Sequence, residues 1–162
     1  MKKALLLITL TLALASCDDT VNGSISRLYF ENSELNPPNE DVGMFVNWTQ
    51  GDKTVIQFLF SHPEEREIAD DELSEIFWIE LPIDQDEFSF TQGVDLPQPE
   101  LEFYYTRSCF CFFERFEFSR AELSGEKIAP NQWRVSFDIV AVADGQEFPF
   151  SDSGIYTLST RE

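Results

Sequence analysis

The chain has 162 residues, of which 43% are apolar and 16 are Phe, enough apolar material for one domain with a buried core. This content excludes an intrinsically disordered chain. Its 30 Asp and Glu outnumber its 11 Lys and Arg and give a formal net charge of −19, which argues against a nucleic-acid partner because the surface repels phosphate. The same charge repels anionic lipid headgroups, so the protein body is expected to stand off a bilayer.

The first residues have the pattern of a secretory leader. Lys2 and Lys3 form a positively charged start, and an apolar run extends from Ala4 to Ala15. A run of this length matches the apolar region of a signal peptide and is too short to span a bilayer stably. We expect residues 1–16 to be removed as a signal peptide.

The leader ends in Leu14-Ala15-Ser16-Cys17, an aliphatic residue and two small residues before a cysteine. This resembles the lipobox of bacterial lipoproteins. In that class the cysteine thiol carries a diacylglycerol, the leader is cut before the cysteine, and the new amine is often acylated. The resemblance therefore implies lipid attachment at Cys17 and, through the lipid, a membrane partner. An ordinary signal peptide followed by a chance cysteine is the alternative.

Two acidic residues, Asp18 and Asp19, follow the cysteine. In some bacteria an aspartate at this place keeps a lipoprotein in the inner membrane, whereas in others nearby acidic residues accompany export to the surface. We expect the outer membrane or the cell surface, with the inner membrane facing the periplasm as the alternative. Residues 17–26 are interpreted as a lipidated stalk and residues 27–162 as a single β domain.

Beyond the stalk, runs of aromatic and β-branched residues alternate with turn signals, which predicts strands. In chain order these predicted strands cover Arg27–Phe30, Met44–Trp48, Thr54–Phe60, Ile76–Leu81, Glu87–Thr91, parts of Leu101–Leu123, Trp133–Ala143 and a last strand that starts at Phe148, pauses at Ser151–Gly154 and resumes as Ile155–Ser159. Turns are predicted at Gln50-Gly51-Asp52, Ser124-Gly125-Glu126-Lys127, Pro130-Asn131 and Asp144-Gly145. Apolar residues at helical spacing, Ala69, Leu73, Ile76 and Phe77, predict a short helix near residues 64–75, with an acidic surface loop as the alternative.

Many short strands without long intervening helices predict an all-β fold. We expect an antiparallel β-sandwich, with a small lipocalin-like β-barrel as the alternative. The distinction matters because a barrel of that kind could enclose a ligand cavity lined by Phe. Within the tract 101–123 a break is expected near Arg107-Ser108, and four Phe of equal parity are expected on one strand face: Phe110, Phe112, Phe116 and Phe118.

The chemical motif of the domain is Cys109-Phe110-Cys111. Exported thiols usually oxidise, but residues two apart in a flat strand are too far separated for a disulfide, so a bridge between Cys109 and Cys111 requires a local turn. Two buried reduced cysteines, or a soft-metal or redox pair, are the alternatives. No Met or His cluster supports a metal, and we predict neither a metal nor another cofactor.

No catalytic set is evident in the sequence. His62 is the single histidine, lies beside Pro63, and is expected to be a surface residue. Acidic groups such as Asp84, Asp86 and Glu87 could bind Ca²⁺ or act as paired carboxylates, but they follow no calcium-loop spacing and are expected to be solvated. We therefore expect not an enzyme but an envelope lipoprotein that acts as a binding or interaction module for a protein or small-molecule ligand. A carrier of an apolar ligand in a Phe-lined barrel is the alternative.

Overall fold

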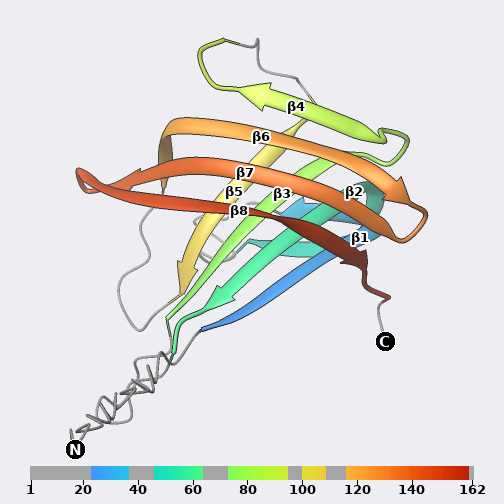
Figure 1. The fold of residues 1–162 in the computed structure, drawn as a ribbon, viewed down its shortest axis with the longest axis horizontal. Helices are drawn as coiled ribbons and strands as arrows, with labels where there is room; N and C mark the ends of the chain where they lie inside the picture. The colour runs from blue at the N-terminus through green and yellow to red at the C-terminus, as the bar shows by residue number, and fades with distance from the viewer. Residues whose placement is uncertain (1–22, 37–45, 64–72, 95–99, 109–115, 161–162) are drawn as a thin grey trace, which may run out of the picture.

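The computed structural model describes residues 23–36, 46–63, 73–94, 100–108 and 116–160, which form eight β-strands (Figure 1). The strands are β1 (Ser24–Asn36), β2 (Asn47–Ser61), β3 (Ser74–Pro82), β4 (Glu87–Thr91), β5 (Glu102–Ser108), β6 (Glu117–Ala129), β7 (Gln132–Ala143) and β8 (Gln146–Leu158). Most of the helix predicted near 64–75 lies outside the described residues, but its end is wrong, because Ser74 already begins β3. Across the described ranges, no helix has the length and apolar character needed to cross a bilayer.

All eight strands belong to one sheet, in the order β4-β6-β7-β8-β1-β2-β3-β5. Neighbours are antiparallel except β1 and β8, which run parallel and pair only at Leu28 with Thr157 and at Tyr29 with Leu158. The all-β prediction is confirmed. The barrel alternative is wrong, because the edge strands β4 and β5 do not pair with each other and the sheet stays open.

The open sheet consists of two halves that cross one another. In Figure 1 the half made of β4, β6, β7 and β8 lies across the half made of β1, β2, β3 and β5. The two layers expected of a sandwich are thus halves of one continuous sheet, joined through the short parallel pairing of β1 with β8. This joint could not be predicted from local sequence pattern, because the paired segments stand at opposite ends of the domain.

The main core fills the space between the two halves. The alternation predicted for β7 is confirmed: Trp133, Val135, Phe137, Ile139, Ala141 and Ala143 are all buried. From the opposite half, Phe77 and Phe58 meet Phe137 with ring centroids 4.6 Å and 5.4 Å away. These close aromatic contacts mean that Phe side chains pack on one another between the halves, which is the edge-to-face and tilted packing that aromatic rings favour.

A second apolar cluster lies on the outer face of the β1-β2-β3-β5 half and consists of Phe30, Leu35, Val46, Val55 and Trp78. Within it β1 is irregular at Ser33, which pairs with both Gln50 and Lys53 of β2, and Leu35 lies beyond this irregularity. Beyond this bulge the Leu35 N–H donates to a carboxylate oxygen of Glu80 at 2.5 Å. The hairpin turn predicted at Gln50-Gly51-Asp52 is therefore wrong, since β2 continues through it as a bulged strand.

Of the remaining turns and pauses predicted from the sequence, two are places where the chain reverses direction and two are not. Asp144 and Gly145 join β7 to β8 with φ of 47° and 76°, as expected for a tight hairpin, and Pro130-Asn131 joins β6 to β7. The turn predicted at Ser124–Lys127 and the pause predicted at Ser151–Gly154 are wrong, because β6 and β8 run through them. The described residues stop at Ser108, the last residue of β5, so the turn or bulge expected near Arg107-Ser108 is not tested. Phe116 and Phe118 pack against the main core, while Phe110 and Phe112 lie outside the described residues.

Candidate functional site

The outer face of the β4-β6-β7-β8 half carries an open groove of about 610 Å³. It is lined by Gln85, Glu87, Phe88, Ser89, Ser124, Gly125, Glu126, Arg134, Ser136 and Ser153. The strand register explains this lining: Ser89 pairs with Ser124, Ser124 with Ser136, and Ser136 with Ser153. Directly paired residues lie on the same face of a sheet, so a row of four serines crosses four strands.

Charged residues flank this serine row on both sides. On one side Arg134 of β7 forms an ion pair with Glu126 of β6. On the other side Arg120 donates to Asp138 at 2.6 Å. Neighbouring strands are about 4.8 Å apart, so the hydroxyls repeat at roughly that spacing, and each can both donate and accept a hydrogen bond. The groove therefore suits a polar, hydrogen-bonding ligand better than an apolar one.

A glycine shapes the floor of the groove. Gly125 stands opposite Phe88, and a Cβ atom built on Gly125 would overlap the Phe88 ring. Phe88 is buried on the core side, where its ring lies 6.0 Å from that of Trp133. A glycine is thus needed at position 125 because the Phe88 ring approaches the backbone closely inside a strand. For this reason the preference of glycine for turns gives a wrong prediction here.

A polar cluster lies where β2 ends, β3 begins and β5 ends. His62 Nε2 lies 2.6 Å from one oxygen of Glu75, and the Tyr105 hydroxyl donates to the other oxygen. Burial, and then this hydrogen bond to Glu75, raise the pKa of Tyr105 well above its ordinary value. His62 also packs edge-on against Phe60 at 4.6 Å between ring centroids. The His62 side chain is 33% exposed, so it lies at the surface as expected, but its ring is held by Glu75 and Phe60.

The cluster pairs an imidazole with a carboxylate, but no nucleophile among the described residues is hydrogen-bonded to that imidazole. Among the described residues, Glu75 is the one hydrogen-bond partner of the His62 imidazole, and no Ser hydroxyl contacts it. Nucleophilic catalysis needs such a contact, at about 2.6–3.2 Å. In the described part of the chain, the arrangement instead ties the ends of three neighbouring strands together through one shared carboxylate.

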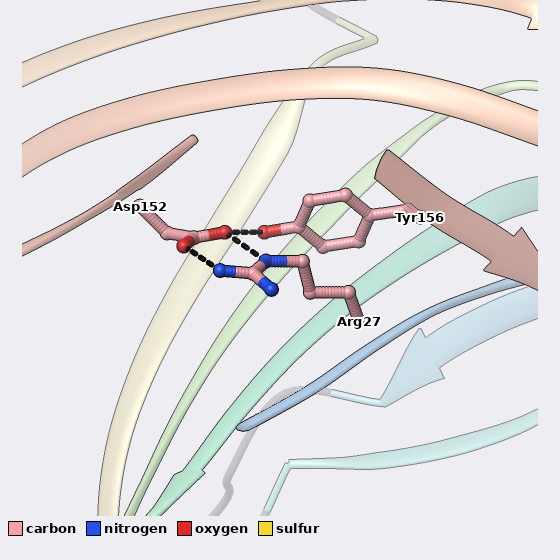
Figure 2. Close-up of polar contacts among 3 residues, drawn as sticks. All are labelled: Arg27, Asp152 and Tyr156. Atoms are coloured by element: carbon pink, nitrogen blue, oxygen red, sulfur yellow. Dashed lines mark hydrogen bonds and ion pairs between the residues drawn. The ribbon is translucent and has the colours of Figure 1, made fainter. Parts of the chain in front are cut away.

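A third polar network lies at the joint between the two halves of the sheet (Figure 2). Arg27 of β1 donates to both oxygens of Asp152 on β8, from Nε at 2.8 Å and from a terminal nitrogen at 2.5 Å. The Tyr156 hydroxyl donates to the same carboxylate at 2.9 Å. The hydrogen bonds that Arg27 donates to Asp152 raise the pKa of Arg27, and burial raises the pKa of Tyr156. Gly154 is needed here as well, because a Cβ on it would overlap the Arg27 side chain.

This Arg27 network reinforces a joint that has few backbone hydrogen bonds. Besides the two residue pairs of β1 with β8, the joint has the Ser159 N–H to Tyr29 carbonyl bond and the Tyr29 hydroxyl to Pro130 carbonyl bond, both 2.9 Å. Lys127 adds an ion pair with Glu31 at 2.9 Å. The Arg27 network thus adds side-chain contacts between the two halves of the sheet.

The residues predicted for chemistry are placed as follows. Cys17, Cys109 and Cys111 lie outside the described residues. Asp84 and Asp86 lie in the connection between β3 and β4, and Glu87 begins β4 at the rim of the groove. Within the described ranges, no three His, Cys, Asp or Glu side chains gather as metal ligands would.

The serine row could not be found from sequence, because its members come from four strands and share no motif. The His62 cluster also depends on strand pairing, which brings together residues that stand far apart in the chain. Comparison with known proteins adds no relative: no protein-family model, no curated protein and no solved structure matches this chain.

Proposed function

We propose that the protein is a membrane-anchored envelope lipoprotein whose β domain acts as a non-enzymatic binding or interaction module. The observation that carries this proposal is Leu14-Ala15-Ser16-Cys17 at the end of a charged and apolar leader. Each buried CH₂ of an attached acyl chain contributes about 0.8 kcal/mol to membrane binding, so two or three chains on Cys17 form a durable anchor. Membrane binding then does not require contacts between the acidic domain and the lipid headgroups.

The distance between Cys17 and the folded domain supports a role close to the membrane. β1 begins at Ser24, and the chain from Cys17 to Ser24 spans at most about 25 Å when fully extended. The serines at this end of the sheet pair across four strands: Ser24 with Ser61, Ser61 with Ser74, and Ser74 with Ser108. This end of the domain faces the lipid in our proposal, and we place the protein at the outer membrane or the cell surface.

The groove on the β4-β6-β7-β8 half supports a binding role. It is open, polar and built on regular strands, which hold its side chains in fixed positions. The acidity of the domain repels anionic headgroups, which keeps its outer faces available to a ligand. An apolar-ligand carrier would need a closed barrel with a cavity lined by Phe. The sheet is not a closed barrel, and the Phe rings of the core contact one another.

Labelled palmitate supplied to cells that express the full chain tests the anchor. Wild type and the matched variant Cys109→Ser are expected to incorporate label and to sediment with membranes. Cys17→Ser is expected to fold but to carry no label, because it lacks the thiol that accepts the diacylglycerol. Palmitate on Cys17→Ser, or its loss from Cys109→Ser instead, contradicts the proposal.

A further inference from the structure

One edge of the sheet is available for strand addition. β5 stands at the end of the strand order, and within the described ranges it pairs only with β3. The pairing is regular over all seven residues, from Glu102 opposite Glu80 to Ser108 opposite Ser74. In an antiparallel ladder alternate residues point their N–H and C=O groups to opposite sides, so the outer side of β5 presents a row of backbone groups that no other described strand pairs with. Figure 1 shows β5 at the margin of its half of the sheet.

β5 lacks several of the features that protect edge strands. Its sequence EFYYTRS has no Pro, Gly or Lys, its register shows no bulge, and its two charged residues, Glu102 and Arg107, stand near its two ends. β4, at the other edge, is shorter, with five residues. Aromatic and β-branched residues make up much of β5, which favours its extended conformation.

Packing on both faces holds β5 rigid. On the core face Tyr105 is 4% exposed, and Phe103 lies 5.0 Å from Phe118 between ring centroids. On the outer face Tyr104 packs against the cluster that contains Trp78 and donates a hydrogen bond to Glu102 at 2.6 Å. A strand held in this way loses little conformational entropy when a partner binds to it.

The charge of the protein indicates the chemistry of the partner. Glu100 and Glu102 are exposed at the start of β5, and the whole chain carries a formal charge of −19. A second copy brings the same charge and is repelled, whereas a basic segment is attracted and guided to the edge. A Lys or Arg placed opposite Glu102 gains a cross-strand charge pair, and one placed over Tyr104 gains a cation–π contact.

We propose that the outer edge of β5 binds an extended, Lys- or Arg-bearing segment of a partner protein, which adds to the sheet as a further strand. This deepens the proposed binding role and rests on it, but it does not require the lipid on Cys17. Loss of palmitate labelling and loss of strand addition are therefore separate results.

A synthetic peptide as long as β5, with alternating Thr and Lys, tests the proposal on the isotope-labelled full chain in detergent. We expect saturable changes in the amide NMR signals of β5 and β3. A peptide of the same charge with Pro in place of the Thr residues cannot pair along its backbone, and we expect it to bind at least about tenfold more weakly. Equal affinity for both peptides, or signal changes confined to other strands, overturns the proposal.

Two lysine variants separate edge pairing from general charge attraction. Thr106→Lys places a positive side chain on β5, and Ser119→Lys makes the same charge change on an exposed residue of β6 outside the groove. We expect Thr106→Lys to weaken peptide binding about tenfold or more and Ser119→Lys to leave it nearly unchanged. Equal loss in both variants contradicts edge pairing. A wild-type dimer in sedimentation that becomes a monomer in Thr106→Lys shows a second copy at the edge and overturns the proposed partner.

Discussion

Replacing Asp152 by Asn tests the joint between the two halves of the sheet. The Asp152 carboxylate is 7% exposed and accepts two hydrogen bonds from Arg27 and one from Tyr156. Breaking a fully buried charge pair by removing one partner costs about 3–5 kcal/mol. The Arg27 side chain remains 31% exposed, so water recovers part of that cost, and we expect the free energy of unfolding to fall by about 2–3 kcal/mol.

Chemical denaturation measures this loss as a lower midpoint with an unchanged slope. Asp138→Asn is the matched control, because Asp138 pairs with Arg120 where both side chains are about half exposed, and such pairs contribute at most about 1 kcal/mol. A double-mutant cycle with Arg27→Leu isolates the pair, and we expect a coupling energy of about 1–3 kcal/mol. If the two changes add to within about 0.5 kcal/mol, the Arg27–Asp152 contact does not stabilise the joint and our reasoning is refuted.

Two further predictions concern the aromatic residues. The pKa of every tyrosine in the chain is raised, with burial as the first cause; these residues are Tyr29, Tyr104, Tyr105 and Tyr156. The unfolded chain releases these protons near pH 10, while the native state keeps them, so the free energy of unfolding should fall as the pH rises above about 10. Ultraviolet absorbance measures the titration of the native tyrosines, and titration near pH 10 would contradict this prediction. Trp133→Ala should cost about 3–5 kcal/mol, because Trp133 is 1% exposed, and an unchanged denaturation midpoint would show that its burial contributes little.

The errors in the predicted strands share a physical cause. Gly51, Gly125 and Gly154 were interpreted as parts of turns or pauses, but each lies inside a strand. A Cβ atom would overlap Glu34 at Gly51, Phe88 at Gly125 and Arg27 at Gly154. Glycine serves equally where a chain reverses and where another group approaches closely, and the approaching group is distant in sequence. Local pattern therefore cannot separate the two uses.

Strands could be predicted from the sequence where apolar and polar residues alternate, because one face of such a strand is buried and the other is not. The alternation from Trp133 to Ala143 gives the inward face of β7 directly, and Asp144-Gly145 gives the hairpin that follows. The groove and the His62 cluster were not predictable, because both are set by strand order and register. His62 and Glu75 meet only because β2 and β3 pair up to Ser61 and Ser74, which also aligns the His62 N–H with the Leu73 carbonyl at 2.9 Å.

Mass spectrometry of the native protein determines whether the chain carries the proposed lipid anchor. We expect a chain that begins at Cys17 and carries a thioether-linked diacylglycerol, with or without an acylated amine. A chain that retains residues 1–16, or one that begins at an unmodified Cys17, would show that Cys17 is not an anchor.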